Sequence, residues 1–306
     1  MMQQKTQAEK NVVTGSVCAL GSEILFGMSY LFTKQAAENS REFYLLGWRF
    51  LIAFFTLSLC GRLGILKIQL KGRNLRPLLL VALVSPCIYF LGETLGITYT
   101  TASESGVFFA CIPAVSLTAS ALILKKKPSK RQIAGIGVTL AGVLLTVSAV
   151  GAASSLSVKG YVCLTAAVLS YALYEVFVER AAGYSGGEIT YVMMCAGALF
   201  FGILAAATAL HRHALEEFLT LPFVNRDFRL AVLYQGMGCS VAAFFLSNVA
   251  ISKIGVNKAA SFIGASTVVS ILSGALLLKE TFTVYQMAGA AVILAGVYLA
   301  NRKNPA

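Results

Sequence analysis

The chain carries ten blocks of mostly apolar residues, each long enough to cross a membrane as a helix. Crossing a hydrocarbon core of about 30 Å takes roughly 20 helical residues. No water satisfies the backbone inside a bilayer, so only helices and closed barrels span it, and barrel strands would alternate strictly over about ten residues. These blocks do not alternate. The sequence therefore predicts an all-α polytopic membrane protein, with ten transmembrane helices near residues 14–35, 43–61, 76–99, 102–124, 131–149, 158–181, 187–210, 229–252, 256–278 and 284–301.

The composition argues against a soluble protein. Hydrophobic residues make up 57% of the chain and charged residues 12%, whereas soluble proteins carry about 25% charged residues. The N-terminal stretch MMQQKTQAEKNVV is polar and lacks the short apolar core and cleavage site of a signal peptide. We therefore expect the first span to be retained.

Basic residues give the chain a net charge of +12, but they lie in loops and form no stripe with aromatic residues of the kind that binds nucleic acid. If the N-terminus is cytoplasmic, 17 of the 25 Lys and Arg residues fall in inner segments, 7 fall in outer segments, and Arg49 lies inside a span. Cytoplasmic loops carry this kind of excess. We expect both termini on the cytoplasmic side of a prokaryotic cytoplasmic membrane, with lipids as neighbours and no nucleic acid partner.

Neither the cysteines nor the histidines indicate a metal site. The seven cysteines lie almost entirely within the spans and form no CxxC pair. We interpret them as small buried hydrophobic side chains. His211 and His213 stand in an outer loop, where we interpret them as solvated surface residues.

The ends of the two halves repeat each other at a constant offset of 154 residues. GIGVTLAGVLL (135–145) recurs as GAAVILAGVYL (289–299) without a gap, and Gln132 falls on Gln286. We infer a duplication into a first five-helix repeat, residues 1–150, and a second, residues 151–306. Because five is odd, the halves enter the membrane in opposite directions, which is the inverted-repeat architecture of many transporters.

Small residues recur on one face of the repeated helix. Gly137 and Ala141 are four residues apart, as are Ala291 and Ala295. This spacing lets helix backbones approach closely. We expect ordinary packing within the bundle, and the alternative is a contact between two copies of the chain, which would be a monomer or a homodimer.

Four motifs are shared with one family of membrane carriers. FGMSYLFTK (26–34) ends the first span, and Arg49 lies in the second. YTTASESG (99–106) leads to an Ile-Pro pair, and LLLKETFTVYQMAG (276–289) opens the last span. Together these motifs resemble the ten-span EamA-type carriers of the drug/metabolite transporter superfamily.

The resemblance implies a secondary transporter with no enzymatic activity and no cofactor. The family moves amino acids, nucleotide-like metabolites, sugars and drugs, so the substrate stays open. The chain departs from the family pattern at Phe26, Lys126 and Thr267, where Trp, Glu and Pro are usual. No Walker motif occurs in the sequence, so a proton gradient or substrate exchange is the expected driving force.

Charged residues inside the spans are costly and point to function. Glu23 lies near the middle of the first span, with Tyr30 on the same face at helical spacing. A carboxylate desolvated at this depth can exchange a proton or accept a cation. The alternative is a structural Glu23 that is paired with or bonded to a neighbouring helix.

A second group of charges belongs to the outer parts of spans two to four. Glu93 follows Tyr89 by one helical turn in span three. Arg49 lies at a similar depth in span two, and Glu104 near the start of span four. These residues either bind substrate or form a structural pair between Arg49 and a carboxylate.

The second half contributes Tyr171, Glu175 and Asn248. Glu175 lies toward the inner end of span six, one turn after Tyr171, and Asn248 lies in span eight. Glu175 either couples transport or forms a hydrogen bond at an inner gate, and Asn248 either lines a cavity or bonds between helices. Tyr30, Tyr89 and Tyr171 flank acids and have rings suited to stacking on an aromatic or cationic ligand.

The excess of buried acids over a single buried arginine favours a cationic or zwitterionic substrate, such as an amino acid, an amine or a cationic drug. We expect a secondary active transporter that works by alternating access, with export as the favoured direction. The alternatives are an uptake carrier for another class, such as a nucleoside or sugar derivative, and an intramembrane enzyme. No histidine lies in a span and no GxSxG or HExxH motif occurs, which argues against the enzyme.

Overall fold

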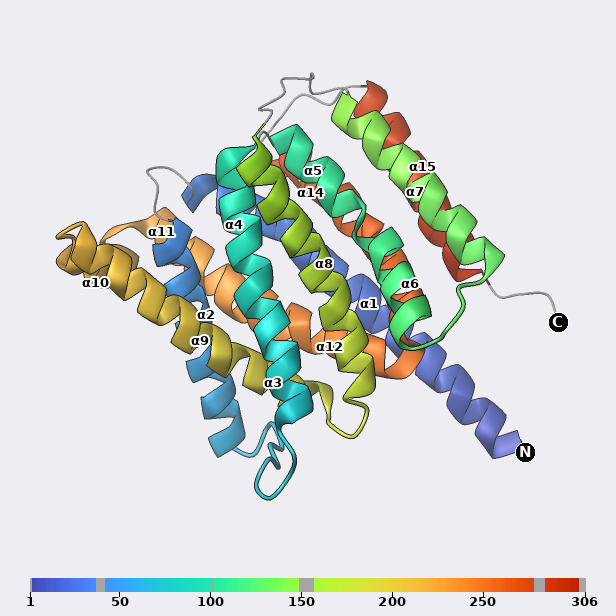
Figure 1. The fold of residues 1–306 in the computed structure, drawn as a ribbon, viewed down its shortest axis with the longest axis horizontal. Coiled ribbons are helices and arrows are strands. Elements are labelled where there is room, and N and C mark those ends of the chain that lie inside the picture. Colours follow the sequence, from blue (N-terminus) through green and yellow to red (C-terminus); the bar gives the residue numbers. More distant parts are fainter. Residues whose placement is uncertain (1, 37–41, 101, 149–156, 278–283, 303–306) are drawn as a thin grey trace.

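The computed structural model describes residues 2–36, 42–100, 102–148, 157–277 and 284–302. Within these ranges the regular elements are all helices, drawn in Figure 1. The boundary expected near residue 150 lies outside the described residues. The elements are α1 (Met2–Ala36), α2 (Glu42–Arg62), α3 (Arg76–Ala82), η1 (Leu83–Ile88), α4 (Tyr89–Tyr99), α5 (Ala102–Ala110), α6 (Ile112–Ile123), α7 (Lys130–Ser148), α8 (Val158–Arg180), α9 (Gly186–His211), α10 (Leu215–Val224), α11 (Arg226–Leu233), η2 (Tyr234–Ala243), α12 (Phe244–Ile254), α13 (Val256–Ala259), η3 (Ala260–Phe262), α14 (Gly264–Leu277) and α15 (Val284–Asn301).

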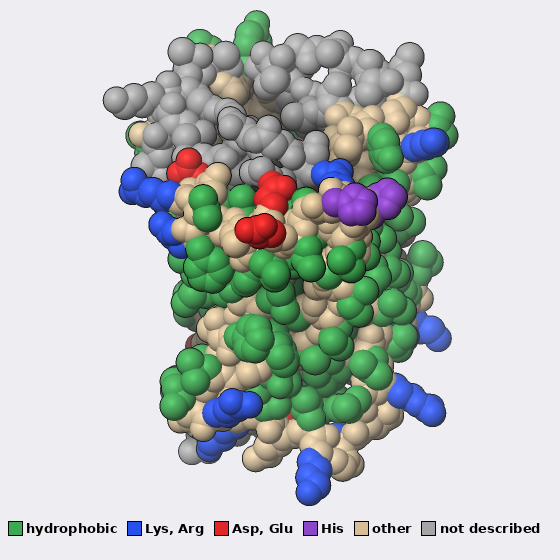
Figure 2. Space-filling model, turned by 90° about the vertical axis from the view of Figure 1, so that its left-hand side faces the viewer, with side chains coloured by type: hydrophobic (Ala, Val, Ile, Leu, Met, Phe, Trp, Pro, Cys, Tyr) green, Lys and Arg blue, Asp and Glu red, His purple; other side chains and the backbone are tan. Residues whose placement is uncertain are grey.

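The described part of the chain confirms the polytopic fold. Nine of its helical stretches are long and apolar enough to cross a membrane, and α7 is the tenth. Apolar side chains cover the middle of the face around α2, α9 and α10, while charged side chains and histidines lie toward its ends (Figure 2). The apolar middle is the surface that lipid would cover. Helix α10 was not expected, because its ten residues are too few to span a membrane.

The third and eighth spans are not continuous α-helices. In the third span, Ser85 has extended torsions (φ −141°, ψ 121°) and precedes Pro86, which has no amide hydrogen to donate. The eighth span contains a ten-residue π-helical stretch, η2. Subtracting the offset of 154 from η2 gives residues 80–89, which include all of η1. The two interruptions therefore occupy equivalent places in the two halves.

The helix contacts follow a two-fold pattern. Helix α4 of the first half packs on α8 of the second, and α12 of the second half packs on α1 of the first. In the same way α6 packs on α8, and α14 packs on α1. Helices α2 and α9, and α7 and α15, pair directly with their own counterparts. The two inverted repeats are thus interleaved, and the centre of the bundle is built by both.

Helices α7 and α15 lie side by side along one edge of the bundle (Figure 1). A Cβ atom on Gly135 would lie 2.6 Å from the Gly296 carbonyl oxygen, and one on Gly142 would lie 2.8 Å from the Gly289 carbonyl oxygen. With the offset of 154, Gly289 is the counterpart of Gly135 and Gly296 that of Gly142. Each glycine therefore meets the counterpart of the other, as a two-fold axis between antiparallel helices requires.

The packing expected for Gly137 and Ala141 was wrong. Both residues are exposed, and a Cβ atom on Gly137 would meet no described atom within 4 Å. Ala291 and Ala295 are exposed as well. The backbones approach each other on the neighbouring face of each helix, where Gly135, Gly142 and their counterparts lie. Residues seven apart lie on one face of a helix, as residues four apart do, so each helix presents both of its glycines to the other.

Candidate functional site

Arg49 is buried in α2 and binds the interrupted helix of the other half. Its Nε donates to Ser240 Oγ at 2.7 Å and its Nη1 to Gln235 Oε1 at 3.2 Å. Its Cζ lies 4.4 Å from the centre of the Phe90 ring. Ser240 and Gln235 both belong to η2. These neutral partners orient the guanidinium, which forms no direct ion pair among the described residues.

Arg49 and Glu93 do not form a direct ion pair. Among the described side chains, ion pairs within 4.0 Å join Arg73 to Glu188 and Lys126 to Glu179. Glu93 in α4 instead accepts a hydrogen bond of 2.8 Å from the Tyr89 hydroxyl, and it interacts with Arg49 electrostatically over a longer gap. The Glu104 side chain, the other expected partner, lies outside the described part.

Glu23 lies in α1 and is only 5% exposed. Ser266 of α14 is its hydrogen-bond neighbour. Glu23 also interacts electrostatically with Glu175 and Tyr171 of the second half. The Tyr30 side chain, expected on the same face, lies outside the described part. Because Ser266 is uncharged, the burial of Glu23 is not offset by an ion pair among the described residues.

Glu175 lies in α8 and is 2% exposed. The Ser116 hydroxyl of α6 donates to its Oε2, which links the two halves. The neighbouring Tyr174 donates to Asn248 Oδ1 at 2.7 Å, and Asn248 donates in turn to Thr190 Oγ1 at 2.9 Å. Asn248 therefore holds α8, α9 and α12 together within the second half.

Aromatic rings connect the charged groups. Phe244 of α12 contacts rings on three other helices, from α1, α4 and α8, and Tyr171 contacts Tyr89 edge-on at 5.2 Å. Phe90 lies beneath Arg49, and Tyr89 bonds Glu93. We call the following rings the aromatic cluster: Phe26, Phe50, Tyr89, Phe90, Tyr171, Tyr174 and Phe244.

The structure thus brings together most of the residues predicted from the sequence, around the aromatic cluster. Asn248 is set apart, since its described bonds join helices of the second half. Sequence reasoning missed Ser116, Ser240 and Phe244. The first two look like ordinary small residues of a span, and Phe244 stands in an apolar run, so no local signal distinguished them. The residues brought to this centre are Glu23, Arg49, Tyr89, Glu93, Tyr171 and Glu175.

The two described ion pairs lie away from this centre, at the end of the bundle where α2, α6 and α8 finish. We call this the basic end. Arg73 Nη1 lies 3.1 Å from Glu188 Oε1, and Lys126 pairs with Glu179. Glu179 Oε2 also accepts the Val256 amide at 2.6 Å. Each pair joins a cation of the first half to a carboxylate of the second.

Comparison with known proteins identifies the family of the chain. The model of the EamA-like transporter family matches the chain twice, at residues 13–148 and 158–302. The chain belongs to this family. It is therefore a transporter.

Individual relatives of this EamA transporter cover nearly its whole length. It is 30% identical over 290 residues to the uncharacterized transporter YcxC of Bacillus subtilis, covering 93% of this chain and 92% of that one. It is 22% identical over 284 residues to a probable amino-acid metabolite efflux pump of Salmonella typhimurium, covering 90% and 91%. A solved crystal structure with 17% identity has the same fold, with a TM-score of 0.77 over 94% of this chain and 96% of that one.

Proposed function

We propose that this protein is a secondary active transporter that exports a small zwitterionic or cationic metabolite, such as an amino acid or amine, by alternating access. The observation that carries the proposal is the set of charges at the centre. Glu23, Glu93, Glu175 and Arg49 lie between the two halves, and none of them takes part in the described ion pairs. Charges at membrane depth are expensive, so groups kept there without a direct ion pair are suited to meet a charged ligand or a proton.

The arrangement favours a substrate with both charges. Arg49 is held by neutral groups of η2, so a ligand carboxylate would supply the missing negative charge. Glu23 and Glu175 both interact with Tyr171 of the aromatic cluster and suit an ammonium group or a proton, and the faces of the aromatic rings suit contact with a cation. The relative of Salmonella typhimurium described as an amino-acid metabolite efflux pump supports the same class.

Interrupted helices in matching places of two halves are a recurring position for transporter binding sites, because the break frees polar backbone groups at the bilayer midplane. In this chain the residues that flank or form the breaks, Tyr89 after η1 and Ser240 within η2, reach the proposed site. The positions of the two interruptions therefore support a substrate site at the same centre.

The loop charges support an orientation with both termini in the cytoplasm. In that orientation the basic end faces the cytoplasm. The two ion pairs that join the halves there would close the cytoplasmic side, and the structure would correspond to a state in which access from that side is blocked.

Transport into or out of proteoliposomes tests the proposal. Purified protein is reconstituted, a pH gradient is imposed, and the flux of labelled amino acids and amines is measured. We expect Glu23→Gln to abolish the dependence of flux on the pH gradient, because the amide cannot gain or lose a proton. Glu216→Gln, which changes an exposed carboxylate of α10, is the matched control and should leave flux unchanged. Full pH-dependent flux in Glu23→Gln would contradict the proton role.

A further inference from the structure

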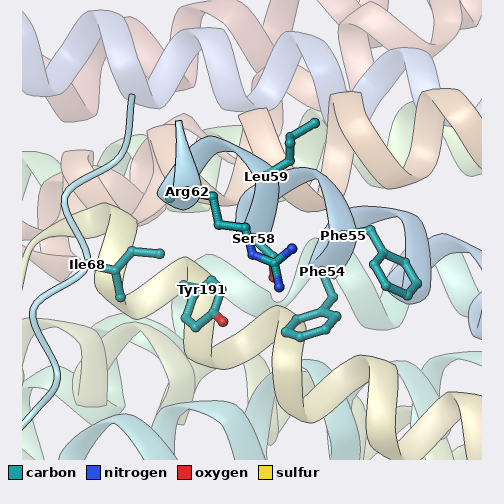
Figure 3. Close-up of a pocket in the computed structure, with 8 residues that line it drawn as sticks. Phe54, Phe55, Ser58, Leu59, Arg62, Ile68 and Tyr191 are labelled. Atoms are coloured by element: carbon teal, nitrogen blue, oxygen red, sulfur yellow. The ribbon is translucent and has the colours of Figure 1, made fainter. Parts of the chain in front are cut away.

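A separate cavity of about 670 Å³ lies at the basic end, outside the central site. It is formed by the last turns of α2, by Ile68 of the following loop and by Tyr191 of α9 (Figure 3). Phe55 and Leu59 at its rim are more than half exposed on the outer side of α2. Because α2 ends at Arg62, the cavity lies where the membrane surface meets water.

Three hydrogen-bond donors line this cavity without a partner among the described residues. The Arg62 guanidinium forms neither a hydrogen bond nor an ion pair there, and Figure 3 shows it directed between the rings of Phe54 and Tyr191. The Ser58 hydroxyl is buried and unbonded, and the Tyr191 hydroxyl makes no described hydrogen bond. The Thr118 hydroxyl inside another span bonds to the backbone four residues earlier, whereas the Ser85 and Ser120 hydroxyls are unbonded like that of Ser58.

The lining matches one kind of ligand. The charged group that lines the cavity is cationic, and the lining contains no carboxylate. Three donors around one space suit an anion with several acceptor oxygens, and a guanidinium suits a phosphate in particular. The remaining lining is apolar and aromatic, and it continues to the exposed Phe55 and Leu59. The occupant therefore combines a phosphate with hydrocarbon.

We propose that this cavity binds an anionic phospholipid of the adjacent leaflet, with its phosphate on Arg62, Ser58 and Tyr191 and its acyl chain along Phe55 and Leu59. Basic pockets between transmembrane helices at the membrane surface select anionic head groups. A zwitterionic lipid would place its own cationic group next to Arg62, so its binding would be weaker. The nearby loop also carries Lys67 and Lys71, which add to the positive potential.

Native mass spectrometry of the full-length protein in detergent tests this assignment. The protein is purified with equal amounts of phosphatidylglycerol and phosphatidylcholine, and the retained lipids are counted. We expect the wild type to prefer phosphatidylglycerol. Arg62→Gln should reduce this preference roughly tenfold, as the loss of a charge-assisted hydrogen bond predicts, and Arg62→Lys should retain part of it. Arg76→Gln removes an exposed cation that does not line the cavity, and it should behave as the wild type.

Two results would overturn the proposal. One is an unchanged preference for phosphatidylglycerol in Arg62→Gln, since the head group would then bind elsewhere. The other concerns the source of the phosphate. If inorganic phosphate alone raises the melting temperature of the wild type but not of Arg62→Gln, and phosphatidylglycerol adds nothing, the site binds a soluble anion.

Ser58→Ala removes one donor with little change of shape, and it should weaken lipid retention in the same direction as Arg62→Gln.

Discussion

Arg49 places a positive charge in the middle of the bundle, where desolvation costs several kcal/mol unless a counter-charge is supplied. Its described hydrogen-bond partners, Ser240 and Gln235, are neutral, and Phe90 contributes the negative face of its ring. Glu93 acts on Arg49 electrostatically, without a direct ion pair. Under the proposed function the substrate carboxylate completes this site. The geometry of Arg49 is therefore set in advance by η2, and binding need not reorganise it.

Changing Arg49 tests the carboxylate contact separately from the proton role of Glu23. We expect Arg49→Gln to raise the KM for an amino acid roughly 10- to 100-fold, because a charge-assisted hydrogen bond contributes about 1.5–3 kcal/mol. The KM for the corresponding amine, which lacks the carboxylate, should stay the same. Proteoliposome uptake of the two labelled compounds measures this split. Equal loss for both compounds would mean that Arg49 serves the fold alone.

At the residue scale the sequence locates the buried charges but not their hydrogen-bond partners. Charges inside apolar spans stand out, so Glu23, Arg49 and Glu175 were found from hydropathy alone. Their partners Ser116 and Ser240 could not be found, because a serine in a span is common and its use depends on which helix lies opposite. That arrangement is decided by tertiary packing.

At the element scale, the backbones of α7 and α15 approach each other closely at two glycine contacts, and the two contacts are related by the internal repeat. Gly142 and Gly289 face each other so closely that a side chain on either would meet the opposite carbonyl. We expect Gly142→Val to lower stability by about 1–3 kcal/mol, the usual cost of overpacking. Gly137→Ala, on the exposed face of the same helix, is the control and should be neutral or slightly stabilising.

The stability of both variants is measured by thermal unfolding in detergent. Unfolding is monitored as the loss of the monodisperse peak in size-exclusion chromatography. A Gly142→Val protein as stable as the wild type would show that α7 and α15 separate easily. A loss of stability in Gly137→Ala as large as that in Gly142→Val would show that the exposed face is packed in the full assembly.

The helices themselves were predictable, and their interruptions were only partly so. Apolar block length and loop charge predicted most span ends within a few residues, but α1 begins at Met2, well before the predicted residue 14. Pro86 gives a sequence reason for a break in the third span, because proline removes a backbone donor. The eighth span has no proline, and Gly236 and Gly238 are the only hints of η2. Where contacts from neighbouring helices stabilise an interruption of a helix, the sequence of that helix gives little sign of it.

At the scale of the whole molecule, the ion pairs at the basic end connect the two halves that would move under the proposed alternating access. The ends of the long Lys126 and Glu179 side chains meet, so cysteines at these two positions lie within reach of a flexible thiol–thiol cross-linker. In a cysteine-free background, we expect Lys126→Cys combined with Glu179→Cys to be joined by a cross-linker with a reducible spacer and to lose transport. Reduction of the spacer should restore the flux. Full transport by the cross-linked protein would show that this end does not open during the cycle.

The reciprocal contacts of α7 and α15 also bear on how the chain is made. The two helices pack through equivalent glycines, so their packing surfaces are alike. Packing therefore does not determine the direction in which each helix is inserted into the membrane. The loops before them differ: KKKPSKR (125–131) is strongly basic, and KETFTV (279–284) is nearly neutral. We therefore expect a few lysines ahead of one copy to set the direction of insertion for two otherwise similar helices, and through them the orientation of the whole protein in the membrane.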